Sequence, residues 1–465
     1  MPSAILCAAI FVPAFVRKHI AANVRIFALL MVFLTGMLSA QTFTTLVNFD
    51  GSNGSLPLDV ALVQGPDGSL WGTTYYGGTG NCNRGCGTIF KMTPSGKLTT
   101  VYSFTNNEVA RPNVGLTLGV DGNFYGVTSA GQLVFRISTN GTFTSLVRFG
   151  KANGYGPSAL VQGVDGNFYG TANSGGTNNV GTIFKVTPSG KFTKILDFDI
   201  VHGAYPEGPL IIGADGNFYG ATGTGGYGCG ATACGTIFKV TPAGALTVVY
   251  TFSGNGYGAD GGLVLAADGN FYGAGSDGEQ DHGVVFQMTP AGTLTTIYTF
   301  PLKGDGGSPY APLTLGSDGN LYGTTEYGTI YEVTSSGTFT NLYNFDNGDP
   351  NAEGGVMQAN NGVFYGVAPM TGTHADGIAY GLNTGLGPIV QSVPTAGKVG
   401  QTIGILGSAL SGTTSVTFNG VSATFTVRSN TVVIATIPSG ATTGRIAVNT
   451  PSGTLYTNAN FLLVP

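Results

Sequence analysis

Three of the four histidines stand close in sequence to carboxylates, a combination that could support chemistry. They are His202, His282 and His374. The neighbouring acidic residues are Glu207, Glu279, Asp281 and Asp376. Imidazole and carboxylate groups can bind a metal or exchange protons with a substrate. The histidines belong to different repeats, however, and the sequence has no G-x-S-x-G, H-E-x-x-H, P-loop or Rossmann motif, so we expect no catalytic site, metal site or cofactor.

A second set of side chains could bind a ligand without converting it. They lie between the expected strands, where segments of varied length on a rigid scaffold can shape a site. Tyrosine offers a flat ring, and arginine and histidine offer hydrogen-bond donors. The candidate ligand-binding residues are Tyr75, Tyr76, Arg84, Arg111, Tyr155, Tyr205, Tyr227, His282, Tyr310 and His374. We expect the partner to be an extracellular glycan or a surface protein.

Four cysteines form two local pairs, and the fifth, Cys7, lies near the N-terminus. Each pair ends directly before a Gly-Thr-Ile-Phe segment. In an oxidising compartment, cysteines so close in sequence are expected to form a disulfide that makes their loop rigid. Zinc could instead use all four thiolates, but the pairs belong to the first and fourth repeats, which a propeller holds far apart. We therefore predict the disulfides Cys82–Cys86 and Cys229–Cys234.

An internal repeat carries these residues. The phrase Asp-Gly-Asn-Phe-Tyr-Gly or a variant of it begins at Asp67, Asp121, Asp165, Asp215, Asp268, Asp318 and Asn361. The copies are about 49 residues apart on average, within the range of four-stranded β-propeller blades. The high glycine content, 78 of 465 residues, agrees with many short strands joined by tight turns.

Two positions of the repeat could themselves suggest binding. The aspartate could bind calcium, but no D-x-D-x-D-G spacing is present, and a turn in which the carboxylate accepts a backbone N–H is favoured. The repeated aromatic residues could form a carbohydrate platform. They are Trp71, Tyr125, Tyr169, Tyr219, Tyr272, Tyr322 and Tyr365. Because they occupy equivalent positions beside Leu or Phe, we expect them to pack between blades.

Each repeat is expected to form four strands. In the third repeat they are Ser158–Gly163, Asn167–Thr171, Gly181–Thr187 and Lys191–Phe198. The first two strands are joined by an Asp-Gly turn and the last two by a Thr-Pro-Ser-Gly turn, and both are tight. The other connections vary widely in length between repeats. Alternate connections lie at opposite edges of a blade, so all variable loops should project from one face.

The seventh repeat lacks its last strand, because the chain passes from Ile378-Ala-Tyr into Asn383-Thr-Gly-Leu-Gly. The segment Thr42–Phe49 matches the fourth strands of other repeats, such as Leu98–Phe104 and Leu294–Phe300. We therefore expect the N-terminal segment to complete the seventh blade and hide its exposed edge. The fold class predicted for residues 41–384 is an all-β, seven-bladed propeller closed by the N-terminal strand.

These repeats resemble the GloVer tandem repeats of bacterial envelope proteins. The resemblance covers roughly Thr42 to Leu382 and rests on the seven copies. It implies secretion and a repeat architecture, but no established activity. Members of the family carry varied C-terminal anchors, and no anchor sequence follows Pro465 here.

The composition changes at Gly385-Leu-Gly-Pro388, and residues 385–465 are expected to form a separate β-sandwich. This part resembles an immunoglobulin-like IPT/TIG domain. The matching segments are Pro388-Ile389, Pro394, Gly397, Gly400, Ile403–Gly407, Val416–Gly420, Ala423–Phe425 and Ile437-Pro438. The resemblance implies a stalk, spacer or interaction module without naming a partner.

Residues 1–40 have the pattern of a secretory signal peptide, with Arg17, Lys18 and Arg25 before an apolar run from Ile26 to Leu38. An uncleaved membrane anchor would need about 20 apolar residues. Cleavage after Ala40 leaves 15 basic and 23 acidic residues, a net charge of −8, which disfavours nucleic acid and anionic membrane as partners. We expect a secreted or extracellular protein that can associate with the cell surface.

Two functions fit these observations. The first is a non-enzymatic binding or cell-envelope scaffold protein that uses the variable loops and the C-terminal domain for contacts. The alternative is a secreted polysaccharide-active enzyme with carboxylates in the same loops.

Overall fold

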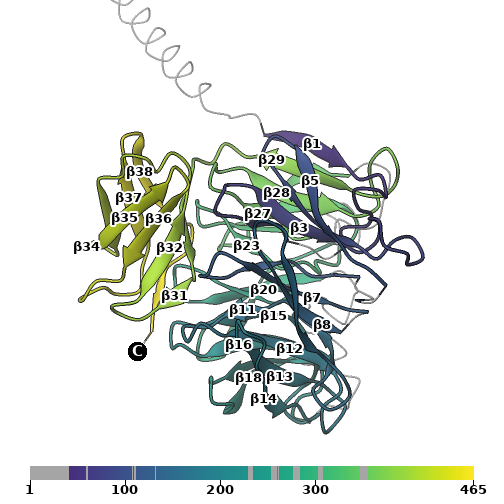
Figure 1. The fold of residues 1–465 in the computed structure, drawn as a ribbon. Helices are drawn as coiled ribbons and strands as arrows, with labels where there is room; N and C mark the ends of the chain where they lie inside the picture. Colours follow the sequence, from purple (N-terminus) through teal and green to yellow (C-terminus); the bar gives the residue numbers. More distant parts are fainter. Residues whose placement is uncertain are drawn as a thin grey trace, which may run out of the picture. The chain divides into compact units, whose positions relative to one another are not determined.

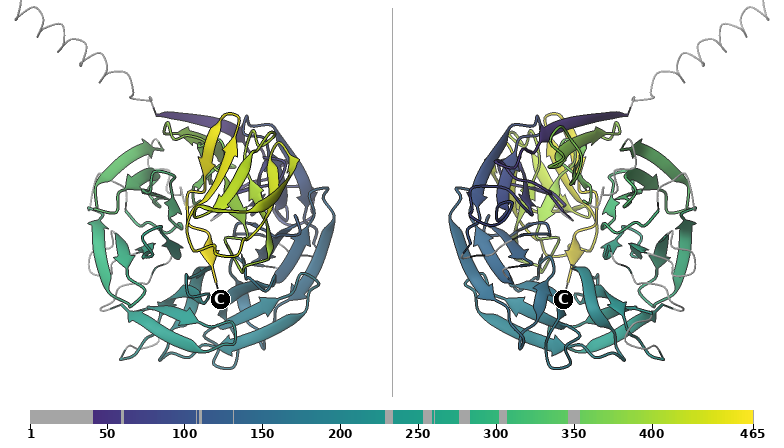
Figure 2. Two further views of the ribbon diagram at one scale, coloured as in Figure 1. Left: turned by 90° about the vertical axis from the view of Figure 1, so that its left-hand side faces the viewer. Right: turned by 90° about the vertical axis from the view of Figure 1, so that its right-hand side faces the viewer.

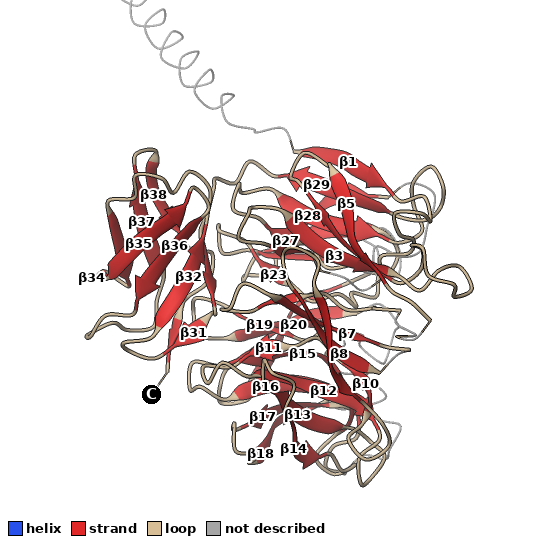
Figure 3. Cartoon of the chain, in the orientation of Figure 1, coloured by secondary structure: helices blue, strands red, loops and turns tan. Residues whose placement is uncertain are grey.

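The computed structural model describes residues 41–58, 61–106, 108, 111–130, 132–228, 234–252, 259, 261–275, 283–301, 307–345 and 354–464. Within these ranges every regular element is a β-strand, so the chain is all-β as predicted (Figure 3). None of the described residues belongs to a helix that is long and apolar enough to span a membrane. Residues Thr42–Pro465 form one compact unit, and this unit is described below.

Residues 42–383 form seven successive antiparallel sheets within the described part of the chain. The first two sheets consist of β2 (Val63–Gln64), β3 (Leu70–Thr74), β4 (Thr88–Met92) and β5 (Leu98–Ser103), then β6 (Thr117–Leu118), β7 (Phe124–Thr128), β8 (Leu133–Ile137) and β9 (Phe143–Arg148). The third and fourth consist of β10 (Tyr155–Pro157), β11 (Val161–Gln162), β12 (Phe168–Ser174), β13 (Thr182–Val186) and β14 (Phe192–Asp197), then β15 (Ala204–Ile212), β16 (Phe218–Thr224), β17 (Thr236–Val240) and β18 (Leu246–Thr251).

The remaining three sheets repeat this order. They consist of β19 (Leu263–Leu265), β20 (Phe271–Gly275), β21 (Val284–Met288) and β22 (Leu294–Thr299), then β23 (Thr314–Leu315), β24 (Leu321–Thr324), β25 (Thr329–Val333) and β26 (Phe339–Asn344), then β27 (Met357–Gln358), β28 (Phe364–Ala368), β29 (Ile378–Asn383) and β1 (Thr42–Asn48). The sheets follow one another around a ring (Figures 1 and 2).

The third sheet illustrates why the repeat folds this way. Its middle strands, β12 and β13, are largely buried, whereas β14 is half-exposed, so the sheet presents an outer strand to solvent. The predicted strands are present within a few residues, and β10 is an additional short strand. Both tight turns place a glycine in the left-handed region, at Gly166 (φ +78°) and Gly190 (φ +92°).

The N-terminal strand belongs to the last sheet, as the sequence predicts. β1 pairs antiparallel with β29, with Phe43 opposite Leu382 and Asn48 opposite Ile378. Residues more than 300 positions apart in the sequence therefore share one hydrogen-bonded ladder. This pairing covers the edge that β29 would otherwise expose.

Neighbouring sheets are joined by the repeated aromatic residues. Tyr125 stacks on Phe168 of the next sheet, with ring centroids 3.8 Å apart, and Tyr169 lies 4.2 Å from Phe218 in the same way. The repeated tyrosines are buried, and five of them donate from the hydroxyl to the turn aspartate of their own repeat, as Tyr125 does to Asp121 at 2.8 Å. In the last repeat Tyr365 instead accepts from Asn361. Asp121 also accepts the backbone N–H of Asn123, which confirms the predicted turn role.

Three buried glutamines form a second link between sheets that the sequence analysis did not identify. Gln64, Gln162 and Gln358 stand at the end of the first strand of their sheets. Each donates to a carbonyl of its own turn and accepts a backbone N–H from the preceding sheet, as Gln162 does from Val120 at 2.9 Å.

Residues 388–464 form two further four-stranded antiparallel sheets. They consist of β30 (Gln391–Val393), β32 (Thr402–Leu406), β36 (Val432–Thr436) and β35 (Thr424–Ser429), then β34 (Val421–Ser422), β33 (Ser415–Phe418), β37 (Ile446–Thr450) and β38 (Gly453–Tyr456). The short strands β31 (Ala396–Gly397) and β39 (Leu462–Leu463) pair in parallel. The two larger sheets contribute to one core that includes Ile405, Phe418, Val433 and Val448.

Candidate binding face

The ring of sheets has two ends, which differ in their connections. We call the end that carries the Asp-Gly turns the turn face, and the end that carries the longer connections between strands two and three and between sheets the loop face. The alternating direction of the strands places these two sets of connections at opposite ends of every sheet.

The C-terminal sheets lie against the turn face, over one part of the ring (Figure 2). Side chains of the C-terminal sheets donate to backbone carbonyls in five of the seven sheets. The contacts are Thr431 to Pro66, Gln401 to Val164, Asn460 to Ala267, Asn458 to Leu315 and Gln391 to Gln358, at 2.6–3.1 Å. Leu462 and Val464 pack into the core of the third and fourth sheets. A cavity of about 380 Å³ remains between these sheets and the inner strands β2, β6 and β11. The turn face is therefore occupied by the chain itself.

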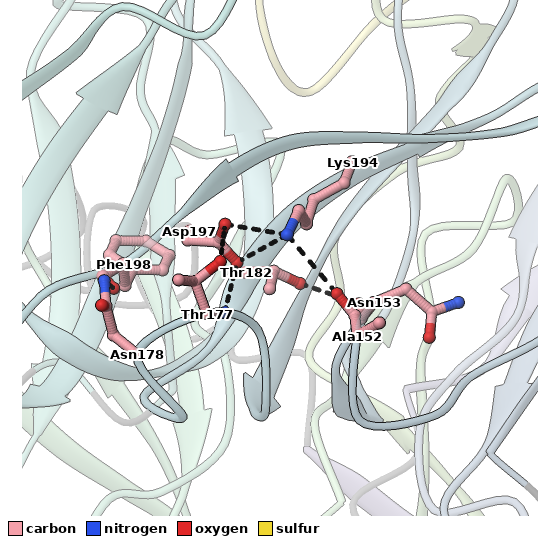
Figure 4. Close-up of polar contacts among 8 residues, drawn as sticks. All are labelled: Ala152, Asn153, Thr177, Asn178, Thr182, Lys194, Asp197 and Phe198. Carbon is pink, nitrogen blue, oxygen red and sulfur yellow. Dashed lines mark hydrogen bonds and ion pairs between the residues drawn. The ribbon is translucent and has the colours of Figure 1, made fainter.

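On the opposite face, the loop of the third sheet is held by side chains near the end of the outer strand β14. Figure 4 shows this in the third sheet, where both carboxylate oxygens of Asp197 accept from Thr177, one from its N–H at 3.0 Å and one from its hydroxyl at 2.8 Å. Lys194 forms an ion pair with Asp197 at 2.8 Å and also donates to Ala152. Burial alone would raise the pKa of Asp197, but the hydrogen bonds and the Lys194 charge outweigh it, so the pKa is lowered.

A residue with left-handed backbone recurs where a connection between sheets reaches the next sheet. Arg111 (φ +46°), Tyr205 (φ +54°) and Ser308 (φ +56°) each precede a proline, and Leu56 (φ +49°) does the same. The proline packs on a glycine of the preceding sheet, so closely that a Cβ on Gly181 would lie 2.5 Å from Pro206. Non-glycine residues seldom adopt this conformation, and they persist where the surroundings fix them. The backbone conformation is thus the same in all four connections, whereas the side chain at this position differs between them.

Four of the predicted binding residues come together in the first sheet and its connection to the second. The guanidinium carbon of Arg84 lies 4.7 Å from the centroid of the Tyr76 ring. The guanidinium of Arg111 lies over both tyrosines, 5.2 Å from Tyr76 and 5.8 Å from Tyr75. The two rings meet edge to face, with centroids 4.7 Å apart. All four side chains are half-buried or exposed. We call them the Tyr–Arg cluster.

A disulfide lies directly beneath this cluster. Cys82 and Cys86 are bonded to each other and enclose Arg84 in their loop. The Arg84 carbonyl accepts from Gly77 at 2.7 Å, and the Cys86 carbonyl accepts the N–H of Arg111 at 3.2 Å. The disulfide therefore fixes the backbone of both arginines. For the second predicted pair, Cys234 is disulfide-bonded, and Cys229 lies outside the described residues.

The other predicted residues are spread around the loop face. Tyr155, Tyr227 and Tyr310 are exposed by 39%, 85% and 44%, whereas Tyr205 packs against the core of the third and fourth sheets. His374 is exposed and contacts the hydroxyl of Thr373, and His282 lies outside the described residues. Sequence analysis missed Tyr327, which is 58% exposed in the tight connection after β24. The sequence pattern that could have identified Tyr327 is an aromatic residue in a turn that is too short to bury the ring.

The described histidines and carboxylates of the loop face do not assemble into a shared site. His202 pairs with Asp199, three residues away, at 2.8 Å. Asp376 accepts from Ser55, and Glu279 and Asp281 lie outside the described residues. No three histidine, cysteine, aspartate or glutamate side chains gather in the described part of the chain in a way that could hold a metal ion.

Comparison with known proteins places the chain by its repeats. The profile of the Gloeobacter/Verrucomicrobia repeat matches residues 32–133, 83–229 and 226–390. The match ends close to where the C-terminal sheets begin, so the IPT/TIG resemblance of the remainder stays a prediction. No functionally curated protein matches the chain.

Solved structures resemble this chain in fold. A streptogramin B lyase is 17% identical, with a TM-score of 0.53 over 74% of this chain and 97% of its own. A catalytically inactive virginiamycin B lyase from Staphylococcus aureus with quinupristin is 16% identical, with a TM-score of 0.53 over 74% of this chain and 99% of its own. At these identities the likeness shows a β-propeller-like fold alone.

Proposed function

Because the chain belongs to the Gloeobacter/Verrucomicrobia repeat family, we propose that it is a secreted, non-enzymatic protein that binds an extracellular glycan through its loop face. In this proposal the seven sheets are the blades of a propeller closed by β1. Residues 385–465 are an immunoglobulin-like domain that covers the opposite end, and residues 1–40 are the signal peptide.

The observation that carries the proposal is the difference between the two ends of the ring. The turn face is occupied by the C-terminal sheets through hydrogen bonds to five sheets. The loop face carries the exposed rings Tyr155, Tyr227, Tyr310 and Tyr327. Aromatic rings on a rigid frame, together with polar groups, suit the stacking and hydrogen bonding that sugars require.

The polysaccharide-active alternative receives less support. A hydrolase needs two carboxyl groups facing each other across the bond that is cleaved. In the described part of the loop face, Asp376 bonds to Ser55 and Asp199 bonds to His202. Asp199 therefore holds its own loop, and Asp376 links its loop to the connection that contains Ser55.

A glycan array probed with the mature protein tests the proposal, with reaction products monitored in parallel. Tyr227→Ala and Tyr327→Ala remove exposed rings of the loop face, and Tyr456→Ala removes one of similar exposure (49%) from the C-terminal sheets as a matched control. We expect the first two to weaken glycan binding without changing the melting temperature and the third to have no effect. Loss of binding only in Tyr456→Ala, or release of sugar products, would contradict the proposal.

A further inference from the structure

We propose that the Tyr–Arg cluster is the subsite for a negatively charged sugar, so that the glycan bound by the loop face is an acidic, carboxylated polysaccharide. This inference rests on the proposed function and specifies its ligand class.

Neither arginine of the cluster is neutralised by the described part of the chain. Arg84 and Arg111 take part in no ion pair and in no side-chain hydrogen bond there, although Arg136 and Arg445 do donate such hydrogen bonds. The carboxylate of Asp376 accepts a hydrogen bond from Ser55, whose backbone pairs with that of Tyr76. The chain has an excess of acidic residues, so two neighbouring cations with no ion-pair partner among the described residues are a specific feature.

The contacts with the tyrosine rings leave these cations available to a ligand. A cation–π contact with a ring uses none of the N–H groups of a guanidinium as donors to an oxygen acceptor. Those groups match a carboxylate through two parallel hydrogen bonds. Because both guanidinium groups lie over the single ring of Tyr76, at 4.7 and 5.2 Å, they are close enough to reach neighbouring charges on one oligosaccharide.

The backbone around the cluster is built to hold it in place. Both arginines have left-handed backbone, with φ values of +64° and +46°. The Cys82–Cys86 disulfide and the hydrogen bonds of Gly77 and Cys86 fix the first loop, and Pro112 fixes the second against Gly87. Side chains ordered before binding lose less entropy when a ligand arrives. Left-handed backbone that is fixed by a disulfide and a proline, and that carries two cations without an ion-pair partner among the described residues, points to a ligand site.

Calorimetric titration with oligogalacturonate, and with its methyl ester as a ligand of the same sugars without charge, tests this inference. We expect the acid to bind and the ester to bind at least about tenfold more weakly, since hydrogen bonds between charged groups are the strong ones. Arg84→Gln and Arg111→Gln should each weaken binding of the acid by about tenfold and reduce its salt dependence. Gln132 adopts φ +49° in this chain, so glutamine is suitable at such positions. Arg428→Gln, at an exposed arginine of the C-terminal sheets, is the matched control and should bind normally.

The outcomes separate this inference from the proposed function. If the acid and the ester bind equally, or if Arg84→Gln and Arg111→Gln both bind the acid normally, the proposal that the glycan is acidic is wrong. If neutral glycans bind and Tyr227→Ala weakens them, the loop face is still the glycan-binding surface. If no acidic or neutral glycan binds the folded protein, both proposals are wrong.

Discussion

Phe43 of the first strand stacks on Tyr343 of the sixth sheet, with ring centroids 3.7 Å apart and planes inclined by 4°. The outer strands of other neighbouring sheets stack in the same way. The ring centroids of Tyr102 and Phe143 are 4.4 Å apart, and those of Tyr298 and Phe339 are 4.5 Å apart. The N-terminal strand therefore makes both the ladder and the lateral contact of an ordinary outer strand.

This contact predicts that the ring depends on its first strand. Deleting Thr42–Asn48 should lower the melting temperature sharply or cause aggregation, because the edge of β29 loses its partner. Phe43→Ala should cost about 1–2 kcal/mol, since the ring is only partly buried. Thr44→Ala, at an exposed position of the same strand, serves as the control. A melting temperature unchanged by the deletion would mean that β1 does not close the ring in solution.

The disulfide is expected to matter more for binding than for folding. Peptide mapping without reduction should find Cys82 joined to Cys86. Replacing both with serine should cost about 2 kcal/mol of stability, because the closed loop is short. The same variant should weaken glycan binding, since Arg84 loses its fixed backbone. Binding equal to that of the parent protein would show that the loop is ordered without the disulfide.

The buried tyrosines predict loss of stability in alkali. The phenol of Tyr272 has its pKa raised to about 12, first by burial and then by its hydrogen bond to Asp268. The pKa values of Tyr125, Tyr169, Tyr219 and Tyr322 are also raised. The unfolded chain releases these protons near pH 10, so stability is full below pH 10 and falls as the pH rises above it. Titration of tyrosine absorbance should show this group ionising only as the protein unfolds. Ionisation of all tyrosines near pH 10 with the fold intact would contradict the buried packing.

The network around Asp197 gives a prediction at acid pH. Because its pKa is lowered, the Asp197 carboxylate stabilises the loop of the third sheet fully at pH values above 3.8, the ordinary pKa of aspartate. This contribution is lost as the pH falls below that value. Asp197→Asn removes the charge opposite Lys194, so it should cost up to about 1 kcal/mol at neutral pH. Amide exchange in residues 175–181 should quicken, whereas the loop of the first sheet at residues 77–87 should not change. Equal exchange in variant and parent would show that the loop is held by other contacts.

Local features of the sequence were sufficient to predict the repeated elements. The Asp-Gly and Thr-Pro-Ser-Gly turns and the match between Thr42–Phe49 and later outer strands identified the sheets and their last member. The clustering of Tyr75, Tyr76 and Arg84 also follows from proximity along the chain. These features depend on residues a few positions apart or on copies of one motif.

The remaining features depend on contacts that no local pattern encodes. Gln64 accepts from Asn360, nearly 300 residues away, and a glutamine before glycine has no turn signal of its own. Arg111 has left-handed backbone because Pro112 must pack on Gly87 of the preceding sheet. The coverage of the turn face arises from single side chains such as Thr431 and Gln401, which were indistinguishable in sequence from other polar surface residues.

Where a side chain at the end of an outer strand holds a loop, it limits how the sequence of that loop can evolve. In the third sheet Asp197 holds Thr177, and in the last sheet Asn48 accepts the N–H of Thr373. In the first sheet Gly78 of the loop lies next to Ser103, the last residue of β5. In the third and last sheets the loop thus depends on one side chain of its own sheet, and the two can diverge together while the neighbouring sheets stay unchanged. A change of specificity at this face therefore requires, at the least, that the loop and the side chain that holds it change together.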